Sequence, residues 1–215
     1  MPPHLKPLFY KGSEKMAKVI IGLTGPTGAG KSTATRAAQS LGFFIINADE
    51  ITRYCQRPNS PLLKELEAAF GDVLNSDGSL NRSVLAEKAF KSSDTTKLLN
   101  SIMLPKVMEE INRRINEREE KFILLDAPTL FEAGADAICK DTIGVLAENE
   151  IRLKRIMERD NIPLSAAKTR MSAGKDDKFY IKRCGHIIYN NKGEKEFQDN
   201  ALKLFQQLKD NFNES

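Results

Sequence analysis

A glycine-rich segment near the start of the chain has the residue types and spacing of a phosphate-binding loop. Residues 25–32 fit the pattern G-x-x-x-x-G-K-[ST] and lie between an expected strand and an expected helix. In such a loop, backbone N–H groups and the positive end of the helix dipole surround nucleotide phosphates. We expect Lys31 to reach the β- and γ-phosphates and the Ser32 hydroxyl to bind Mg²⁺. The residues predicted to hold the nucleotide here are Gly25, Pro26, Thr27, Gly28, Ala29, Gly30, Lys31, Ser32 and Thr33.

A second candidate for chemistry is Asp49, which lies just past the apolar run 43–46. A kinase needs a group that orients or deprotonates the attacking hydroxyl, and the carboxyl end of a strand beside the phosphate loop is its expected place. Arg53 lies one turn further and falls on the same side if a helix begins at Ala48 or Asp49. The alternative is that Asp49 only caps a helix beginning near Ile51, which is a common role for aspartate.

A third feature is the concentration of positive charge in residues 150–183. This segment has ten lysines and arginines against five acidic residues, a net charge of +5, whereas the whole chain carries +4. Arginines on a segment that closes over a nucleotide can neutralise the charge of phosphoryl transfer and exclude water. A solvated helix face would give the same charge, so both interpretations stay open for the segment as a whole.

Other motifs exclude several classes of nucleotide-binding protein. A GTP-dependent switch would carry D-x-x-G after the third strand and N-K-x-D for guanine. Here Asp126 is followed by Ala-Pro-Thr, and residues 191–194 read Asn-Lys-Gly-Glu. Transport and helicase ATPases are normally larger and have further signature segments that do not occur in this sequence. A kinase of a small molecule remains.

These candidates need a sheet to position them, and the sequence pattern predicts one. Short apolar runs alternate with longer helical stretches, which is typical of a parallel sheet covered by helices. The expected strands are 18–23, 43–47, 121–126, 142–147 and 186–189. Helices are expected after Lys31, Ile151 and Lys195, and over 60–70, 83–91 and 95–118. The predicted fold is α/β, a P-loop kinase with a parallel five-stranded sheet flanked by helices, a helical insertion and a basic helical lid.

The chain is expected to form one folded unit after a short extension. Residues 1–17 are expected to be a poorly ordered N-terminal extension, since the start of the chain is rich in proline and lacks periodicity. Residues 18–215 are then a single P-loop kinase domain. Within it, 53–120 is expected to form a helical lobe over the site, and 150–183 the lid.

Composition excludes further classes. The 215 residues, 40% of them hydrophobic, suffice for one sizeable core, and no apolar run approaches the roughly 20 residues that cross a bilayer. Three widely spaced cysteines indicate neither a disulfide framework nor a metal cluster and fit a reducing cytoplasm. A charge of +4 is too dilute to indicate a nucleic-acid partner. We therefore expect a cytoplasmic protein with no membrane or nucleic-acid partner.

The ordered set of motifs resembles the dephospho-coenzyme A kinases, a family with a P-loop kinase fold related to the nucleoside monophosphate kinases. The resemblance runs from about residue 18 to residue 205. It is carried by residues 23–32, by Ala48 and Asp49 with Arg53, by residues 78–82 with Leu85 and Phe90, by residues 126–132, by Arg155 with Arg159 and Asp160, and by Ile187 and Ile188 followed by Asn190.

This resemblance implies transfer of the γ-phosphate of ATP to the ribose 3′-hydroxyl of dephospho-coenzyme A, giving coenzyme A and ADP in the last step of coenzyme A synthesis. It implies Mg²⁺ as cofactor, residues 53–120 as the acceptor-binding lobe, and a monomer or weak homo-oligomer. The implied catalytic residues are Asp49, Lys31 and Arg159. Arg155 and Asn190 are implied as further ATP contacts, and the implied acceptor contacts are Asp49, Arg53, Arg82 and Asp126.

The sequence departs from the family pattern at five positions. Asn47 occupies the position of a usual aspartate, and Leu104 that of the histidine of a His-Pro pair. Arg152 and Gly174 occupy positions where glutamine is usual, and Gly185 lies near the position of a usual aspartate. All lie outside the set formed by Lys31, Ser32, Asp49 and Arg159, so we expect an active member. The alternatives are a P-loop kinase of another nucleotide or small hydroxyl acceptor, and a non-catalytic nucleotide-binding module. Asp49 distinguishes a kinase from the non-catalytic module, because a module that only binds nucleotide has no need of a carboxylate at the γ-phosphate.

Overall fold

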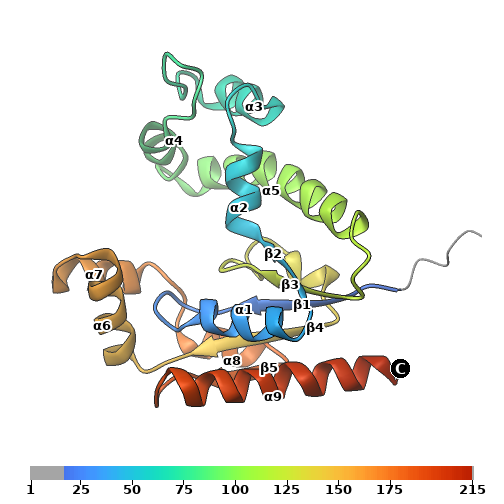
Figure 1. Cartoon of the computed structure of the whole chain (residues 1–215). Coiled ribbons are helices and arrows are strands. Elements are labelled where there is room, and N and C mark those ends of the chain that lie inside the picture. Colours follow the sequence, from blue (N-terminus) through green and yellow to red (C-terminus); the bar gives the residue numbers. More distant parts are fainter. Residues whose placement is uncertain (1–16, 215) are drawn as a thin grey trace, which may run out of the picture.

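The structure, a computed structural model, describes residues 17–214. The predicted N-terminal extension, residues 1–17, lies outside the described residues except for Ala17. Helices connect the strands along the described chain, with four consecutive helices between β2 and β3 and three between β4 and β5 (Figure 1). Within this part of the chain, no helix combines the length and the apolar character needed to cross a membrane.

A single parallel sheet of five strands lies at the centre of the described chain, in the order β2-β3-β1-β4-β5. Its strands are β1 (Val19–Thr24), β2 (Phe44–Asn47), β3 (Phe122–Asp126), β4 (Asp141–Leu146) and β5 (His186–Tyr189). Asp126 is the register partner of both Leu23 and Asn47, so β1, β2 and β3 end together at one edge. The five predicted strands are confirmed to within one residue.

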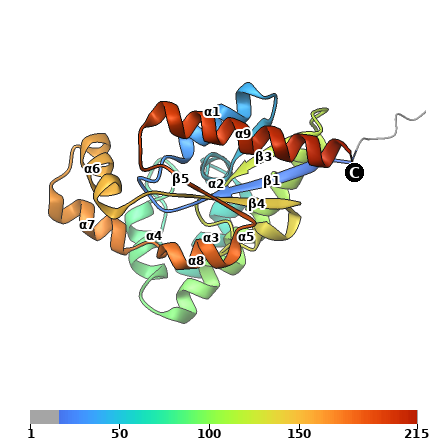
Figure 2. The ribbon, with the colours of Figure 1, turned by 90° about the horizontal axis from the view of Figure 1, so that it is seen from below.

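Helices cover the sheet on both faces, because its inner strands are apolar on both sides. α1 (Lys31–Ser40) and α9 (Glu194–Asn213) lie side by side over one face (Figure 2). Phe197, Ala201, Phe205 and Leu208 of α9 are spaced three or four residues apart and are buried in this core. The opposite face, through Ile123 and Leu125, belongs to a second core that includes residues of α5.

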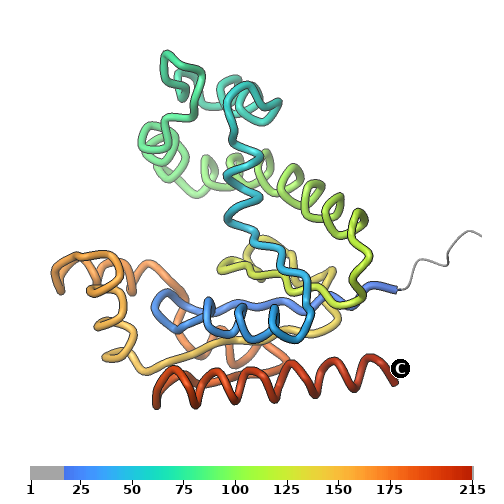
Figure 3. The backbone as a smooth tube through the Cα atoms, in the orientation of Figure 1, coloured from blue at the N-terminus to red at the C-terminus, as the bar shows by residue number. Residues whose placement is uncertain are grey.

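The predicted insertion folds as a helical lobe, which projects from the sheet (Figures 1 and 3). It contains α2 (Ala48–Cys55), α3 (Pro61–Phe70), α4 (Arg82–Ala89) and α5 (Ser93–Asn116). Leu63, Leu66 and Ile111 are fully or almost fully buried, so the lobe has its own apolar interior, continuous with the core under β3. α2 leaves the end of β2 directly, and this places its first turn at the edge where the strands end.

The basic segment also folds as helices. These helices are α6 (Asn149–Asp160), α7 (Leu164–Ser172) and α8 (Asp177–Arg183). Outside this segment, a short 3₁₀ helix (Ala135–Ile138) precedes β4. In Figure 3, α6 and α7 form a second projection, separate from the lobe. The prediction of a basic helical segment beside the sheet is confirmed.

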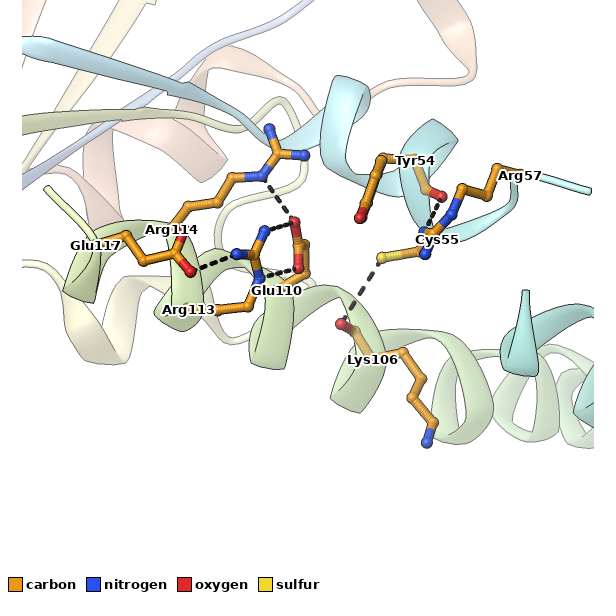
Figure 4. Close-up of polar contacts among 8 residues, drawn as sticks. All are labelled: Tyr54, Cys55, Arg57, Lys106, Glu110, Arg113, Arg114 and Glu117. Carbon is orange, nitrogen blue, oxygen red and sulfur yellow. Dashed lines mark hydrogen bonds and ion pairs between the residues drawn. The ribbon is translucent and has the colours of Figure 1, made fainter. Parts of the chain in front are cut away.

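A charged cluster joins α5 to α2 (Figure 4). The Glu110 carboxylate, whose side chain is 11% exposed, accepts hydrogen bonds from Arg113 Nε at 2.7 Å and Arg114 Nε at 2.8 Å. The Arg114 guanidinium lies 5.1 Å from the centre of the Tyr54 ring on α2, a cation–π contact. Cys55 Sγ donates to the Lys106 carbonyl at 3.8 Å. The cluster therefore fixes the end of α2 distant from Asp49.

Replacing Glu110 should destabilise this junction in a pH-dependent way. The hydrogen bonds from Arg113, with those from Arg114, hold the pKa of Glu110 at about 2, well below its ordinary value of 4.5. Glu110→Gln removes the carboxylate partner of Arg114 and leaves Arg113 with Glu117 alone, so the free energy of unfolding at pH 7 should fall by about 1–3 kcal/mol. Because the pKa is lower in the folded than in the unfolded chain, this stabilisation is complete above the unfolded pKa and is lost as the pH falls toward 2.

Urea unfolding at a series of pH values from 7 to 3 measures this effect. The matched control is Glu117→Gln, which also removes a partner of Arg113 but whose side chain is 54% exposed. We expect the control to cost less than about 1 kcal/mol. A loss in Glu110→Gln that stays constant down to pH 3 would contradict the assignment.

Candidate active site

A cavity of about 790 Å³ opens where the carboxyl ends of the strands meet the phosphate loop and the basic helices. Binding sites in open α/β sheets are expected at this edge. The predicted site residues that line it are Gly25, Pro26, Thr27, Gly28, Gly30, Lys31, Ser32, Asp49, Asp126, Arg155 and Arg159. The structure thus brings together residues that come from three distant parts of the sequence.

The phosphate loop runs from β1 into α1, and its backbone is fixed by close packing. Gly25 has φ +143°, and a Cβ atom there would lie 2.2 Å from the Val145 carbonyl oxygen, so only glycine fits. Gly30 is the N-cap of α1 and has no side chain that could compete for the first N–H groups of the helix. Those groups and the helix dipole can therefore serve an anion in the cavity.

Side chains from α6 and from the segment after β5 hold the outer side of this loop. Asn190 is buried and donates to the Ala29 carbonyl at 2.9 Å. Arg155 donates to Asn190 Oδ1 at 3.1 Å and to the Gly28 carbonyl at 3.4 Å. Asn190 does not line the cavity. In the structure it supports the loop from outside, and the implied contact with the nucleotide base stays a prediction.

Lys31 and two carboxylates form the charged centre of the cavity. Lys31 Nζ donates to the Gly25 carbonyl at 2.7 Å. Burial lowers the pKa of Lys31, while the charges of Asp126 and Asp49 act in the opposite direction. Burial also raises the pKa of Asp126, against the effect of Lys31 and of a 3.1 Å hydrogen bond from Thr35. Lys31 and Asp126 therefore have shifted pKa values and act on each other, as groups in binding sites commonly do.

The structure decides between the two interpretations of Asp49. The N-cap of α2 is Asn47, whose Oδ1 accepts from the backbone N–H of Glu50 at 3.1 Å, and the helix begins at Ala48. The capping interpretation of Asp49 is therefore wrong, and its exposed carboxylate lines the cavity from the first turn of the helix. Asn47 is well suited to the cap, because its short side chain brings an acceptor oxygen to a free N–H of the first turn.

Two arginines of the basic segment face the cavity as a pair. Arg159 on α6 makes a two-pronged contact with Asp160, at 2.8 and 3.0 Å, and Arg170 on α7 bonds the same carboxylate. This hydrogen bonding raises the pKa of Arg159. Arg170 was not among the predicted site residues, although it belongs to the basic segment. A purely solvated face does not account for these residues, since Arg155, Arg159 and Arg170 line one cavity.

Four further predicted residues do not line the cavity. Ala29 is buried beneath the loop, and the buried Thr33 accepts from Arg36 at 3.0 Å. Arg53 and Arg82 are exposed on the lobe, the first one turn beyond Asp49 and the second at the start of α4. The structure does not bring these two arginines to the phosphate loop, and their implied contacts with an acceptor remain predictions.

Several lining residues were not predicted as site residues. They are Asn47, Pro128, Thr129, Glu132, Arg152, Arg170, Met171, Ala173, Gly174, Lys175 and Tyr180. Tyr180 is buried, and burial raises its pKa to about 12, so it stays a neutral hydroxyl at pH 7. Pro128, Thr129 and Glu132 fall within the motif at 126–132. A signal for them was therefore present in the sequence, whereas Tyr180 had none.

The oxygen atoms in the cavity fit a hard cation carried by phosphates. The Ser32 hydroxyl and the Asp126 carboxylate line it, and Mg²⁺ prefers oxygen ligands. Within residues 17–214 no group of three or more His, Cys, Asp or Glu side chains is placed to hold a metal. This donor set suits Mg²⁺ held by few protein ligands and by the nucleotide itself, which is the usual arrangement beside phosphates.

Comparisons with known proteins agree on one family. The family model described as "Dephospho-CoA kinase" matches residues 19–196. The dephospho-CoA kinase of Corynebacterium glutamicum is 36% identical over 192 residues, which cover 87% of this chain and 96% of that protein. The dephospho-CoA kinase of Moorella thermoacetica is 36% identical over 174 residues, covering 79% of this chain and 82% of that protein.

Among solved structures, similar chains include one further dephospho-CoA kinase and others with the same fold. Dephospho-CoA kinase from Campylobacter jejuni superposes with a TM-score of 0.57 and 27% identity, covering 88% of this chain and 97% of that chain. TT1252 from Thermus thermophilus gives a TM-score of 0.79 and 27% identity, covering 89% and 97%. Shikimate kinase from Acinetobacter baumannii, at 18% identity and a TM-score of 0.52 over 91% and 96%, shares the fold.

Proposed function

This chain belongs to the dephospho-CoA kinase family, and from that premise we propose that its cavity is where the γ-phosphate of ATP passes to the ribose 3′-hydroxyl of dephospho-CoA. The products are CoA and ADP, so the reaction is the last step of CoA synthesis. The observation that carries the proposal is the meeting, in one cavity, of the phosphate loop, the Asp49 carboxylate and the arginines of α6 and α7.

The phosphate loop and Lys31 bind and orient the nucleotide. Backbone N–H groups of residues 25–32 surround the phosphates, and the Lys31 ammonium, now on the Gly25 carbonyl, reaches the β- and γ-oxygens. Arg159, with Arg170 beside it, neutralises charge on the transferring group and excludes water. Catalysis of phosphoryl transfer is mainly positioning and charge stabilisation, and these groups supply both.

Asp49 orients the acceptor hydroxyl and takes its proton. As the 3′-oxygen forms its bond to the γ-phosphorus, the bond to the bridging β–γ oxygen breaks, and the hydroxyl proton passes to the Asp49 carboxylate. Its exposed position at the carboxyl end of β2 leaves room for a hydroxyl between it and the loop. When bound with ATP, Mg²⁺ neutralises the phosphate oxygens, and Ser32 is the residue we expect to hold it.

We place the acceptor between the cavity and the lobe, with Asp126, Arg53 and Arg82 as its contacts. Asp126 lines the cavity, and the two arginines are exposed on α2 and α4, where their charge can meet the acceptor's pyrophosphate. A monomeric or weakly associating enzyme in the cytoplasm remains our expectation. So does the division into a single domain, 18–215, with the lobe at 53–120 and the lid at 150–183.

An acceptor panel tests the proposal. ADP release is measured with ATP and Mg²⁺ while dephospho-CoA, nucleoside monophosphates, shikimate or no acceptor is offered. We expect turnover with dephospho-CoA to exceed that with every other acceptor by about 100-fold or more, since an acceptor that lacks groups with which the site pairs leaves polar groups of the site unpaired. Fast turnover with another acceptor, together with no turnover with dephospho-CoA, would contradict the proposal. ATP binding without any turnover would favour a non-catalytic module.

A further inference from the structure

Arg152 is the most deeply buried arginine of the cavity wall and is not part of the proposed chemistry. Its side chain is 5% exposed, and it comes from the first turn of α6. Burying a guanidinium away from water is costly unless hydrogen bonds and an opposite charge compensate it. The partners of Arg152 therefore indicate what the residue does.

One partner is the phosphate loop itself. Arg152 Nε donates to the Thr27 carbonyl at 3.0 Å. The backbone of α6 also packs against the loop here, because a Cβ atom on Gly28 would lie 2.8 Å from the Arg152 carbonyl oxygen. The backbone N–H groups of the loop are the donors available to the phosphates. A hydrogen bond from Arg152 to a loop carbonyl therefore fixes the loop without occupying any of those N–H groups.

The other partner is the start of α8. Arg152 Nη1 lies 3.6 Å from Asp177 Oδ1, which is close enough for an ion pair but longer than a hydrogen bond. Within residues 17–214, Asp177 Oδ1 is a buried oxygen that no hydrogen bond satisfies. A shift of α8 toward α6 by a fraction of an ångström would complete the bond. The charge of Arg152 is thus paired with Asp177, and the length of this ion pair depends on where the start of α8 lies.

The surroundings limit the alternatives. Besides Asp177, Asn149 Oδ1 accepts a hydrogen bond from Arg152 Nη1 at 3.3 Å, and Tyr180 on α8 acts electrostatically on Arg152. Arg152 also acts electrostatically on Lys31, in the direction that lowers the lysine's pKa. Asp177 is therefore the carboxylate that compensates the charge of Arg152. Replacing either residue removes the ion-pair partner of the other.

We propose that Arg152 and Asp177 are a positioning pair, which fixes the outer side of the phosphate loop to α8 and so makes ATP affinity depend on where α8 lies. The inference rests on the proposed kinase function only in that ATP is the ligand. Arg152 acts through the Thr27 carbonyl.

ATP affinity without acceptor is the direct test. Calorimetry with Mg²⁺ and ATP compares the unsubstituted chain with Arg152→Gln, Asp177→Asn and the double variant. Each single change should raise the Kd for ATP by about 10-fold, as expected for losing a charge-assisted hydrogen bond or its support. The double variant should be no weaker than the weaker single variant, because both changes break one connection. The matched control is Lys154→Ala on the same helix, whose side chain is 78% exposed and whose Kd should not change.

Two further readouts separate positioning from simple stability. With dephospho-CoA, the KM for ATP should rise while kcat and the KM for the acceptor stay within about twofold, the pattern of lost uniform binding. In Asp177→Asn, which keeps the buried arginine, hydrogen exchange of residues 25–32 should accelerate. An unchanged Kd in folded variants, additive losses or unchanged exchange would overturn the proposal. If dephospho-CoA is not a substrate, the Kd and exchange results still decide it.

Discussion

Asp49→Asn should lower kcat by about 100-fold or more, the scale typical of losing a general base. The amide is similar in size and cannot accept the proton of the attacking hydroxyl. ATP affinity should stay close to that of the unsubstituted chain, because no contact between Asp49 and the phosphate loop is needed to hold the nucleotide. Steady-state kinetics with dephospho-CoA, together with calorimetric ATP binding, separates the two effects. The capping role is excluded by Asn47, so a folding defect is not the expected cause of the loss.

The control for this prediction is the neighbouring Glu50→Gln. Glu50 is the next residue of α2, is also exposed, and lines a separate, smaller cavity with Tyr54 and Arg114. The same chemical change there should leave kcat within about twofold, as surface substitutions away from a site usually do. If Asp49→Asn turns over at nearly the unsubstituted rate, Asp49 has only a structural role and another group must serve the hydroxyl.

Lys31→Ala should lower kcat/KM for ATP by about 1,000-fold, the upper range for removing one preorganised donor to developing charge. Lys31 contacts phosphate oxygens both before and during transfer, so kcat should fall and KM should rise together. The substitution also removes the cation that lowers the pKa of Asp126, which should raise the already elevated pKa of that carboxyl further. The kcat/KM profile from pH 5 to 8, measured by ADP release, checks both expectations.

A second lysine of the cavity provides the comparison. Lys175 also lines the cavity, but it is exposed and lies 5.5 Å from the centre of the Phe179 ring. If Lys31 acts by position, Lys175→Ala should change kcat/KM by no more than about fivefold, since exposed charges act weakly through water. Equal losses in the two variants would mean that general positive charge, and not the phosphate loop, carries the effect.

Local patterns predicted most of the fold because local physics determines it. The central strands are buried on both faces, so they appear as uninterrupted apolar runs such as 122–125. The loop at 25–32 is recognisable because each of its residue types meets a local steric or electrostatic need. Gly25, for instance, has no room for a Cβ atom. Errors at strand ends stayed within one residue for the same reason.

The less predictable part of the site depends on contacts between distant segments. The sequence left the role of Asp49 open, since a shift of three residues in the start of α2 decides whether it caps the helix or faces the cavity. Arg170 reaches the cavity only because α7 folds back onto Asp160. Arg152 and Tyr180 become neighbours through packing of α8. No residue pattern encodes such long-range geometry.

The support of the phosphate loop by Asn190 has a consequence for the order in which the site forms. The two residues of the Asn190–Ala29 hydrogen bond are 161 positions apart, and β1 lies between β3 and β4, which come more than 90 residues later. Contacts this far apart in sequence form slowly, because the intervening chain must be ordered first. The loop residues are therefore among the first parts of the site to be synthesised. Their supporting contact with Asn190 is among the last to form. A nascent chain that has not yet passed β5 holds the nucleotide-binding motif without the geometry to use it.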